Sequence, residues 1–496
     1  MLDGGPLAPE NRLYVATISA GTAGGKGTHM DPRPFTPRPR RFRTGLLLGA
    51  VFLAGVTFGP VAGRLGAHFG VTFGLAPAAF ADVTGNSDTY RLLTLFGDVF
   101  ERVRADYVDP VPDKDLVENA VNGMLTGLDP HSNYMDAKAF RDMQVQTKGE
   151  FGGLGIEVTQ DGGWIKVISP IDDTPAARAG IKAGDMITAI DGKTVQGLAL
   201  SDAVDKMRGP PNSKITLTLH RDGVDKPIDV SMMREIIQIQ VVKSRMEPDG
   251  IGYVRLTQFT EQADAGIKKA VQQLQAQAAK DAPGGKLKAL ILDLRNNPGG
   301  LLDQAIKVSS AFLGRGEIVS TRGRDPDDVQ RFTASGGDLT KGKPLIVLVN
   351  GGSASASEIV AGALQDHRRA TILGTRSFGK GSVQTIIPLQ DDSALRLTTA
   401  RYYTPSGRSI QAKGIEPEIV VQENVPADLQ GEDQTHGEAG LKGHLESQDK
   451  TEEGGSSAYV PADEKDDTQL AAAIALLHGT QKSAFFPPDP KAGIPN

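Results

Sequence analysis

Apolar residues between positions 86 and 147 recur every three to four residues, which is the spacing of amphipathic helices. Such stretches cover Tyr90–Tyr107, Leu116–Leu128 and Ala137–Val145. Asp-Pro pairs follow the first two, and proline cannot continue a helix. We therefore predict an N-terminal helical region over residues 86–147.

The spacing changes at Lys148, where alternating strands and glycine-rich turns replace the helical pattern. The runs that alternate in the manner of half-buried strands are WIKVIS (164–169), DMITAI (185–190) and KITLTLH (214–220). A short helical stretch, Ser201–Met207, separates the last two runs. This order of elements predicts one compact domain over residues 148–235.

A third pattern occupies residues 236–420, where strand-like and helix-like stretches alternate. The continuous apolar runs LKALILDL (287–294) and LIVLV (345–349) are typical of strands that are buried on both faces. Helical stretches such as Glu261–Lys280 and Ser357–Leu364 lie between the strands. The pattern predicts an α/β core, with a mixed sheet and flanking helices.

After Val421 the chain becomes acidic and rich in Gly, Ser and Gln. Such a composition cannot bury much apolar surface, so we predict a partly disordered acidic tail over residues 421–496. One short helix is expected within it, at Gln469–Leu477.

Residues 1–85 have the features of an N-terminal targeting extension. An arginine-rich cluster precedes residues 44–63, which carry no charge and are just long enough to span a bilayer. A small-x-small pattern, Ala79-Phe80-Ala81, follows. The segment is thus either an inner-membrane anchor or a signal peptide removed after Ala81; the Pro- and Arg-rich flanks disfavour a buried core helix. Positive charge before the span predicts export of the remainder, so we expect a periplasmic protein.

Composition excludes several kinds of chemistry. The 496 residues include no cysteine, which excludes disulfides, thiolate zinc sites and cysteine nucleophiles. The net charge of −6 argues against a nucleic-acid partner. We expect neither a metal ion nor a cofactor.

The segment Asn350–Glu358 (NGGSASASE) lies between a buried strand and a helix, where a side chain is presented beside the free N–H groups of the helix start. Small neighbours leave room for a substrate backbone, so Ser355 is a candidate nucleophile. The alternative is a capping box, in which Ser355 and Glu358 only begin the helix. On this segment alone, the capping box is the favoured interpretation.

A nucleophilic serine needs a base, and two histidines and one lysine are candidates. His131 and His367 lie outside the extension and the tail, but His367 falls at a polar helix end and reads as a satisfied surface residue. Lys380 lies in a glycine loop, and burial could lower its pKa far enough for it to act as a base. Gln384, four residues on, falls on the same side of an extended chain and could orient the lysine. The alternative is a solvent-exposed loop lysine.

The stretch Gly374–Lys380 also matches a phosphate-binding loop up to its lysine. The next residue should be Ser or Thr, but it is Gly381, and a strand rather than a helix follows. We therefore reject ATP binding.

A Pro-Gly-Gly turn follows the buried strand that ends at Leu294. The backbone N–H groups of Gly299 or Gly300 could point inward and join the N–H of Ala356 in an oxyanion hole. Turns of this kind are common, so the motif alone is weak.

Taken together, the motifs LRNNPGG (294–300), SASASEI (353–359) and FGKGSVQ (378–384) resemble the carboxyl-terminal processing peptidases, also called tail-specific proteases. The resemblance extends from about residue 90 to 420 and includes the 25-residue spacing from Ser355 to Lys380. It implies a serine–lysine protease core with an inserted PDZ domain. In that family's terms Ser355 is the nucleophile, Lys380 the base and Gln384 its partner.

The resemblance also gives the small domain a function. Gly153-Leu154-Gly155-Ile156 looks like the loop with which a PDZ domain binds a terminal carboxylate, although an ordinary glycine-rich hairpin is the alternative. The walls of the pocket would be Ile156, Val204 and Met207. Arg208 resembles a position implicated in linking the PDZ domain to the protease.

We therefore expect a serine endopeptidase that recognises apolar carboxyl termini of protein or peptide substrates. The alternative is a catalytically silent PDZ scaffold in the periplasm. We also expect a homo-oligomer, with an adaptor protein as a candidate partner.

Overall fold

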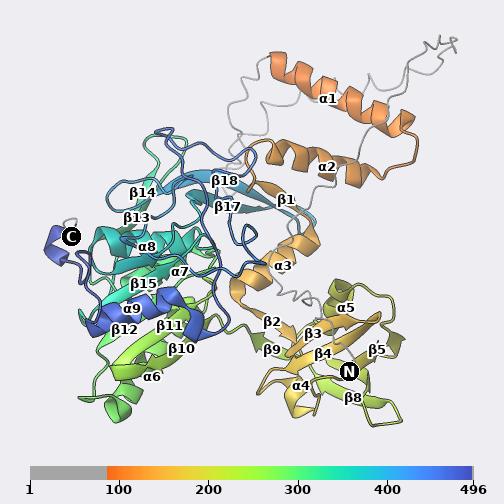
Figure 1. Ribbon diagram of the computed structural model, residues 1–496. Helices are drawn as coiled ribbons and strands as arrows, with labels where there is room; N and C mark the ends of the chain where they lie inside the picture. Colours follow the sequence, from red (N-terminus) through yellow and green to blue (C-terminus); the bar gives the residue numbers. More distant parts are fainter. Residues whose placement is uncertain (1–86, 494–496) are drawn as a thin grey trace, which may run out of the picture. The chain divides into compact units, whose positions relative to one another are not determined.

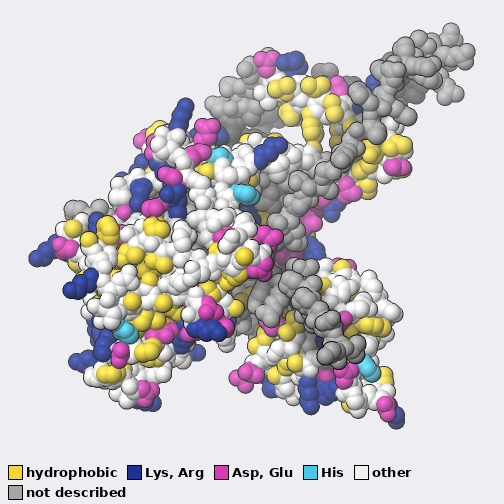
Figure 2. Space-filling model, in the orientation of Figure 1, with side chains coloured by type: hydrophobic (Ala, Val, Ile, Leu, Met, Phe, Trp, Pro, Cys, Tyr) yellow, Lys and Arg dark blue, Asp and Glu magenta, His cyan; other side chains and the backbone are white. Residues whose placement is uncertain are grey.

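The computed structural model describes residues 87–493, in two units that divide after Pro110 (Figure 1). The predicted signal or anchor at residues 44–63 lies outside the described residues. The described part of the first unit is helix α1 (Ser87–Asp106), and its apolar side chains, including Leu93, Phe96 and Val99, are exposed (Figure 2). No helix within residues 87–493 combines the length and the apolar composition that crossing a membrane requires.

The second unit begins with the rest of the predicted helical region. It consists of α2 (Asp113–Thr126), the short strand β1 (Asn133–Met135) and α3 (Ala137–Lys148). Asp136 caps α3 by accepting a hydrogen bond from the N–H of Ala139 at 2.7 Å. The helix ends at Gly149, whose φ of 69° suits a glycine.

The predicted small domain is an antiparallel sheet with two short helices. The sheet has the order β3-β4-β5-β7-β8, and β6 pairs with β5. Its elements are β3 (Ile156–Asp161), β4 (Trp164–Pro170), α4 (Pro175–Arg178), β5 (Met186–Ile190), β6 (Lys193–Thr194), α5 (Leu200–Met207), β7 (Lys214–His220) and β8 (Ile228–Met233). A separate two-stranded ribbon, β2 (Glu150–Gly153) with β9 (Glu235–Gln238), joins the two ends of the domain.

The α/β core is built on a six-stranded sheet of order β10-β11-β12-β15-β16-β19, parallel except for β10 (Figure 1). The strands are β10 (Val242–Glu247), β11 (Ile251–Leu256), β12 (Ala289–Asp293), β15 (Leu345–Val349), β16 (Thr371–Gly374) and β19 (Ile419–Val420). Every residue of β12 and β15 is buried, as their continuous apolar runs predict.

Helices cover both faces of this sheet. Leu290 and Leu292 pack with α6 (Ala263–Asp281), α7 (Leu302–Ser310) and α8 (Ala356–Asp366). The alternate residue Ile291 packs on the other face with Leu470 of α9 (Thr468–His478).

A second, five-stranded sheet contains the strand that follows the loop of the predicted lysine. Its order is β1-β18-β13-β14, and β17 also pairs with β18. The strands are β13 (Glu317–Arg322), β14 (Val329–Thr333), β17 (Ser382–Pro388) and β18 (Ala394–Tyr403). Single 3₁₀ turns lie at Pro248–Gly250, Glu464–Asp466 and Pro490–Ala492.

The prediction of partial disorder after Val421 is wrong for the described part of the tail. The segment packs on the core: the backbone N–H of Gly351 donates to Ser457 O at 3.0 Å, and Glu438, only 1% exposed, donates its own N–H to Phe378 O at 2.9 Å. Polar side chains and backbone, rather than apolar residues, anchor it, so its composition gave no sign of order. The expected short helix is present as α9.

Candidate active site

Ser355 occupies the turn between strand β15 and helix α8. Its backbone has φ 53° and ψ −109°, a conformation that non-glycine residues rarely adopt and that is concentrated at functional sites. The predicted capping box is present, since the N–H of Ser355 donates to the Glu358 carboxylate at 2.7 Å. The cap and the nucleophile interpretations are compatible, because the cap orients the backbone of a partly exposed serine.

Glu358 does more than cap the helix. Its fully buried carboxylate also accepts hydrogen bonds from Ser377 Oγ (2.6 Å) and from the N–H groups of Gly379 (2.7 Å) and Lys380 (2.9 Å). Burial raises the pKa of Glu358 to about 7, although these donors act in the opposite direction. One carboxylate thus joins the Ser355 turn to the lysine loop. The sequence interpretation assigned it only a capping role.

Lys380 lies in the loop between β16 and β17 and is partly buried, which disfavours the solvent-exposed alternative. Burial lowers the pKa of Lys380, while the carboxylate of Glu438 raises it. Among the described residues, no hydrogen bond joins Lys380 Nζ to Ser355 Oγ. The structure brings the two loops together through Glu358 rather than through a direct contact of the two side chains.

Gln384 begins the extended part of β17, next to a register shift between Val383 and Gln384. Its Nε2 donates to Thr398 Oγ1 of β18 at 2.7 Å. Its Oε1 is buried, and no hydrogen-bond partner for it exists among residues 87–493. The side-chain amide is therefore held through its NH₂ group, while its carbonyl oxygen is available to another hydrogen-bond donor.

The Pro-Gly-Gly turn lies directly beside the start of α8. A Cβ on Gly299, whose φ is 100°, would lie 2.9 Å from both Ala356 N and Ser355 Cβ, so only glycine fits. The N–H of Gly299 donates to Asn297 Oδ1 at 2.9 Å. Within the described chain, the N–H groups of Gly300 and Ala356 make no hydrogen bond. Two of the three predicted oxyanion donors are thus unengaged.

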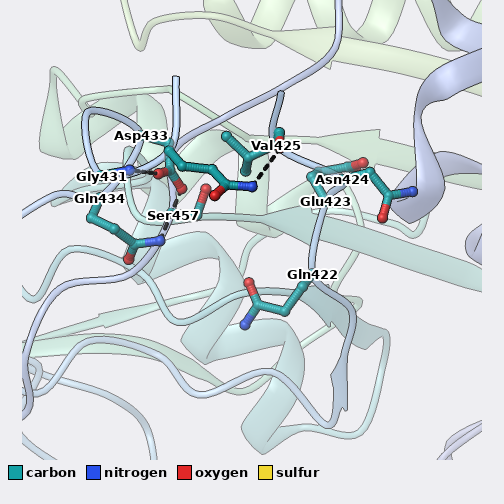
Figure 3. A pocket seen from close by; sticks show the side chains of 9 residues that line it. Gln422, Glu423, Asn424, Val425, Gly431, Asp433, Gln434 and Ser457 are labelled. Atoms are coloured by element: carbon teal, nitrogen blue, oxygen red, sulfur yellow. Dashed lines mark hydrogen bonds between the residues drawn. The ribbon is translucent and has the colours of Figure 1, made fainter. Parts of the chain in front are cut away.

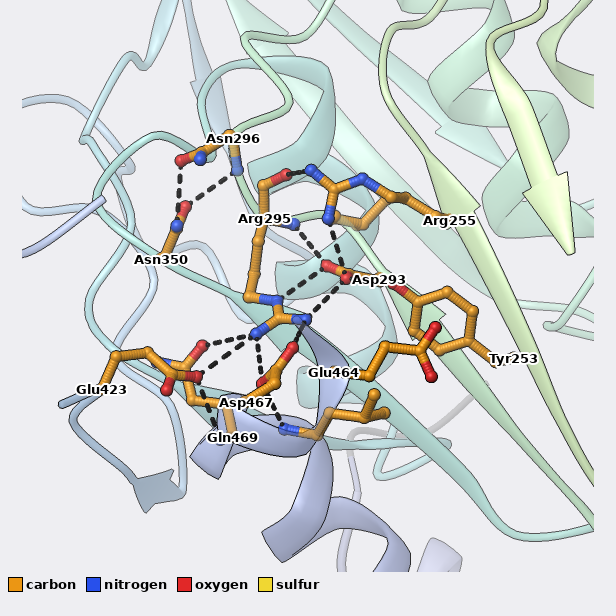
Figure 4. A network of polar contacts seen from close by, with 12 residues as sticks. Tyr253, Arg255, Asp293, Arg295, Asn296, Asn350, Glu423, Glu464, Asp467 and Gln469 are labelled. Carbon is orange, nitrogen blue, oxygen red and sulfur yellow. Dashed lines mark hydrogen bonds and ion pairs between the residues drawn. The ribbon is translucent and has the colours of Figure 1, made fainter. Parts of the chain in front are cut away.

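A buried ion cluster fixes the beginning of this turn (Figure 4). Arg295, 1% exposed, pairs with Asp293 of β12 and with Asp467 at the start of α9, each at 2.8 Å. Burial alone would raise the pKa of Asp293, but Arg295 and Arg255 hold it at about 2. The backbone that leads to Gly299 is therefore anchored to the C-terminal helix as well as to the sheet.

The two candidate histidines have other partners. His367 lies at the end of α8, and its Nε2 is 2.7 Å from Glu317 O of β13. His367 is buried rather than on the surface as predicted. The strand β13 thus supplies a partner for Nε2, while the buried Nδ1 has no hydrogen-bond partner among residues 87–493. Nε2 of His131 lies 2.8 Å from Glu438 Oε2, so this histidine pairs with the C-terminal tail.

The predicted carboxylate-binding loop, Gly153–Ile156, leads into β3, an edge strand whose outer side has no partner among the described strands. Gly155 has a φ of 74°, and the N–H groups of Leu154 and Gly155 donate to no other described residue. Ile156, Val204 and Met207 pack on one core cluster, next to this loop.

Arg208, the predicted regulatory residue, ends helix α5. Its guanidinium lies 4.8 Å from the centre of the Phe151 ring in β2 and 3.8 Å from Asp142 of α3. The side chain thus bridges the small domain and the N-terminal helical region.

A polar hollow lies within the C-terminal tail (Figure 3), and one residue of its lining, Glu423, also pairs with Arg295 at 3.4 Å. Its lining consists of Gln422, Glu423, Asn424, Val425, Gln430, Gly431, Asp433, Gln434 and Ser457. None of them belongs to the predicted catalytic or peptide-binding set.

Family models match three parts of the chain. The model described as peptidase family S41 matches residues 250–421, and the PDZ domain model matches residues 152–232. The model of the activating protease CtpB N-terminal domain matches residues 81–139.

Relatives match over most of the chain. The carboxy-terminal-processing protease of Bartonella bacilliformis is 60% identical over 411 residues, which cover 82% of this chain and 94% of that protein. The carboxyl-terminal-processing protease of Synechocystis is 35% identical, over 72% of this chain and 82% of the relative. Among solved structures, the photosystem II D1 C-terminal processing protease is 31% identical, with a TM-score of 0.39, over 68% of this chain and 95% of that one. The chain therefore belongs to the carboxyl-terminal processing proteases, PDZ-containing serine endopeptidases of family S41.

Proposed function

We propose that this endopeptidase cuts with a Ser355–Lys380 dyad and selects substrates by their carboxyl termini. The observation that carries the dyad is the buried Glu358 carboxylate, which accepts hydrogen bonds from the backbone N–H groups of both residues. Lys380 is also partly buried, and burial lowers its pKa toward the range in which a lysine can act as a base.

In the proposed reaction, neutral Lys380 takes the proton of Ser355 Oγ as that oxygen attacks the substrate carbonyl carbon. The unpaired Oε1 of Gln384 accepts a hydrogen bond from the resulting ammonium group. The ammonium then gives its proton to the leaving amine, and an acyl-enzyme ester remains on Ser355. Water, deprotonated by Lys380, hydrolyses the ester and restores the enzyme.

The negative oxygen of each tetrahedral intermediate needs N–H donors. We assign Ala356 and Gly300 to this role, because neither N–H group makes a hydrogen bond within the described chain. Ala356 directly follows Ser355, and Gly300 directly follows Gly299, which packs against the Ser355 turn. The N–H of Gly299 would join them if it left Asn297.

Substrate selection is proposed for the small domain. The free N–H groups of Leu154 and Gly155 suit a terminal carboxylate, and the open edge of β3 suits an added peptide strand. The apolar residues Ile156, Val204 and Met207 favour an apolar terminal side chain.

The proposed location is the periplasm, with residues 44–63 as an anchor or a cleaved signal. Cell fractionation combined with a protease-accessibility assay would test this location. The proposed homo-oligomer is supported by the apolar side chains exposed on α1, and sedimentation would test it. An adaptor protein stays a prediction.

The test of the proposed function is cleavage of an unfolded protein with an apolar, free carboxyl terminus, followed by mass spectrometry. We expect defined fragments from the wild type and none from Ser355→Ala. Binding of the same protein without cleavage by either form would favour the silent PDZ scaffold.

A further inference from the structure

The tail segment of residues 433–458 lies beyond the matched peptidase model, yet it contacts both loops of the proposed dyad. The contacts are Ser457 O with Gly351 N–H (3.0 Å), Ser456 Oγ with Arg376 O (2.6 Å) and Glu438 N–H with Phe378 O (2.9 Å). The segment thus touches the serine turn on one side and the lysine loop on the other.

Glu438 is the one carboxylate of this segment that is almost completely buried, at 1% exposure. His131 Nε2 lies 2.8 Å and 3.1 Å from its two carboxylate oxygens, and Gln411 Nε2 donates to Oε1 at 2.9 Å. A buried charge is costly unless it is paired and hydrogen-bonded, and these partners meet that need.

Gln411 connects this carboxylate to the lysine loop. Its Oε1 accepts a hydrogen bond from the N–H of Gly381 at 3.0 Å, while its Nε2 binds Glu438. Together with the bond to Phe378 O, this relay attaches Glu438 to the residues on both sides of Lys380. The Glu358 carboxylate accepts hydrogen bonds from the two N–H groups between them. The loop is therefore held directly by Glu358, and by Glu438 through its backbone N–H and through Gln411.

Among the described residues, charged groups on four different elements act electrostatically on Lys380. They are Glu438 of the tail, Arg396 of β18, Glu358 of α8 and Asp129 before β1. Of the four, Glu438 has the largest effect on the pKa of Lys380, which it raises. A carboxylate favours the ammonium form of a nearby lysine, so it also delays the loss of the proton as pH rises.

We propose that Glu438 is a positioning residue of the catalytic site, which acts through Lys380 and makes the 433–458 segment part of the catalytic unit. This inference rests on the proposed role of Lys380 as the base. It assigns the segment a function that its acidic, polar composition does not suggest.

The test is the pH dependence of kcat/KM for Glu438→Gln, which keeps the shape of the side chain and removes its charge. Without the carboxylate, Lys380 loses its proton at lower pH, so the rising limb of the profile should move down by about one pH unit. Glu438→Asp keeps the charge and should leave the limb near its wild-type position. Glu418→Gln is the matched control, because Glu418 is also a partly buried carboxylate and it accepts a hydrogen bond from the N–H of Ile372 in β16.

An unmoved limb in Glu438→Gln, or an equal shift in the Glu418→Gln control, would overturn the inference. Loss of the fold in Glu438→Gln, measured by circular dichroism, would assign the residue a structural role and would also overturn it. Lys380→Arg is measured in parallel: if it is active, the proposed dyad itself is wrong. If it is inactive while the Glu438→Gln limb stays in place, only the role of Glu438 is wrong.

Discussion

The backbone N–H of Lys380 donates to the carboxylate of Glu358 at 2.9 Å, although the two residues are 22 positions apart in the sequence. Because the other contacts of this carboxylate include the N–H of Ser355, the lysine loop cannot move freely relative to the serine turn. The two residues of the proposed dyad are thus positioned through their backbone N–H groups.

Glu358→Gln should lower kcat/KM by about 100-fold with little change in substrate binding, because 1 Å errors in catalytic geometry have costs of this size. In the variant, the amide NH₂ group would face N–H and O–H groups that donate to the carboxylate in the wild type, and it cannot accept their hydrogen bonds. Steady-state kinetics would measure this loss. The control Glu416→Gln removes a charge from an exposed surface pair with Arg376 and should retain activity. Wild-type kinetics in Glu358→Gln would contradict the positioning role.

Ser355→Ala should abolish cleavage, with a loss of at least ~10³-fold, as expected for a nucleophile. Ser353→Ala and Ser357→Ala should keep part of the activity, because their buried hydroxyls donate to Leu294 O and Asn297 O and have a structural role. Cleavage assays with folding checked by circular dichroism would separate the three. An active Ser355→Ala enzyme would leave only the capping role.

Amidation of the substrate's carboxyl terminus should weaken binding or activation, because the N–H groups of Leu154 and Gly155 would lose their anionic partner. Competition between acid and amide forms of one apolar peptide measures the effect. Equal rates and affinities for both forms would rule out terminal carboxylate recognition.

Asp467→Ala should lower the free energy of unfolding by roughly 3 kcal/mol, because Arg295 stays buried with one fewer counterion. Urea denaturation at neutral pH measures the change. Asp463→Ala is the control, since this exposed residue pairs with Lys465 on the surface and its loss should cost less than ~1 kcal/mol. Equal effects of the two variants would show that the cluster contributes little.

The order of helices, strands and domains could be predicted because apolar spacing reflects which faces are buried. The runs 287–294 and 345–349 specify the central strands in this way, and the turns that follow them carry Gly299 and Ser355. Since the carboxyl ends of neighbouring parallel strands meet at one sheet edge, their proximity also follows from the pattern.

The buried contacts that support the site, such as that of Glu438 with His131, could not be predicted, because they join residues that are far apart in the sequence. Glu438 lies in an acidic stretch that resembles a disordered linker, and nothing near it indicates His131 as its partner. The signal for Arg295 was weak but present: Asp293 is a charge at the end of a fully apolar strand, where a buried partner is required. Glu358, in an otherwise apolar helix, gave the same kind of signal.

The central claim is that Lys380 is the base for Ser355, and the rate of peptide cleavage by Lys380→Arg across pH tests it most directly. Arginine keeps the positive charge but does not lose its proton in proteins, so it cannot accept one from Ser355. The account predicts a folded, inactive variant, and a wild-type rate that rises with pH along a limb well below the ~10.4 of a free lysine. A fully active Lys380→Arg enzyme would contradict the dyad.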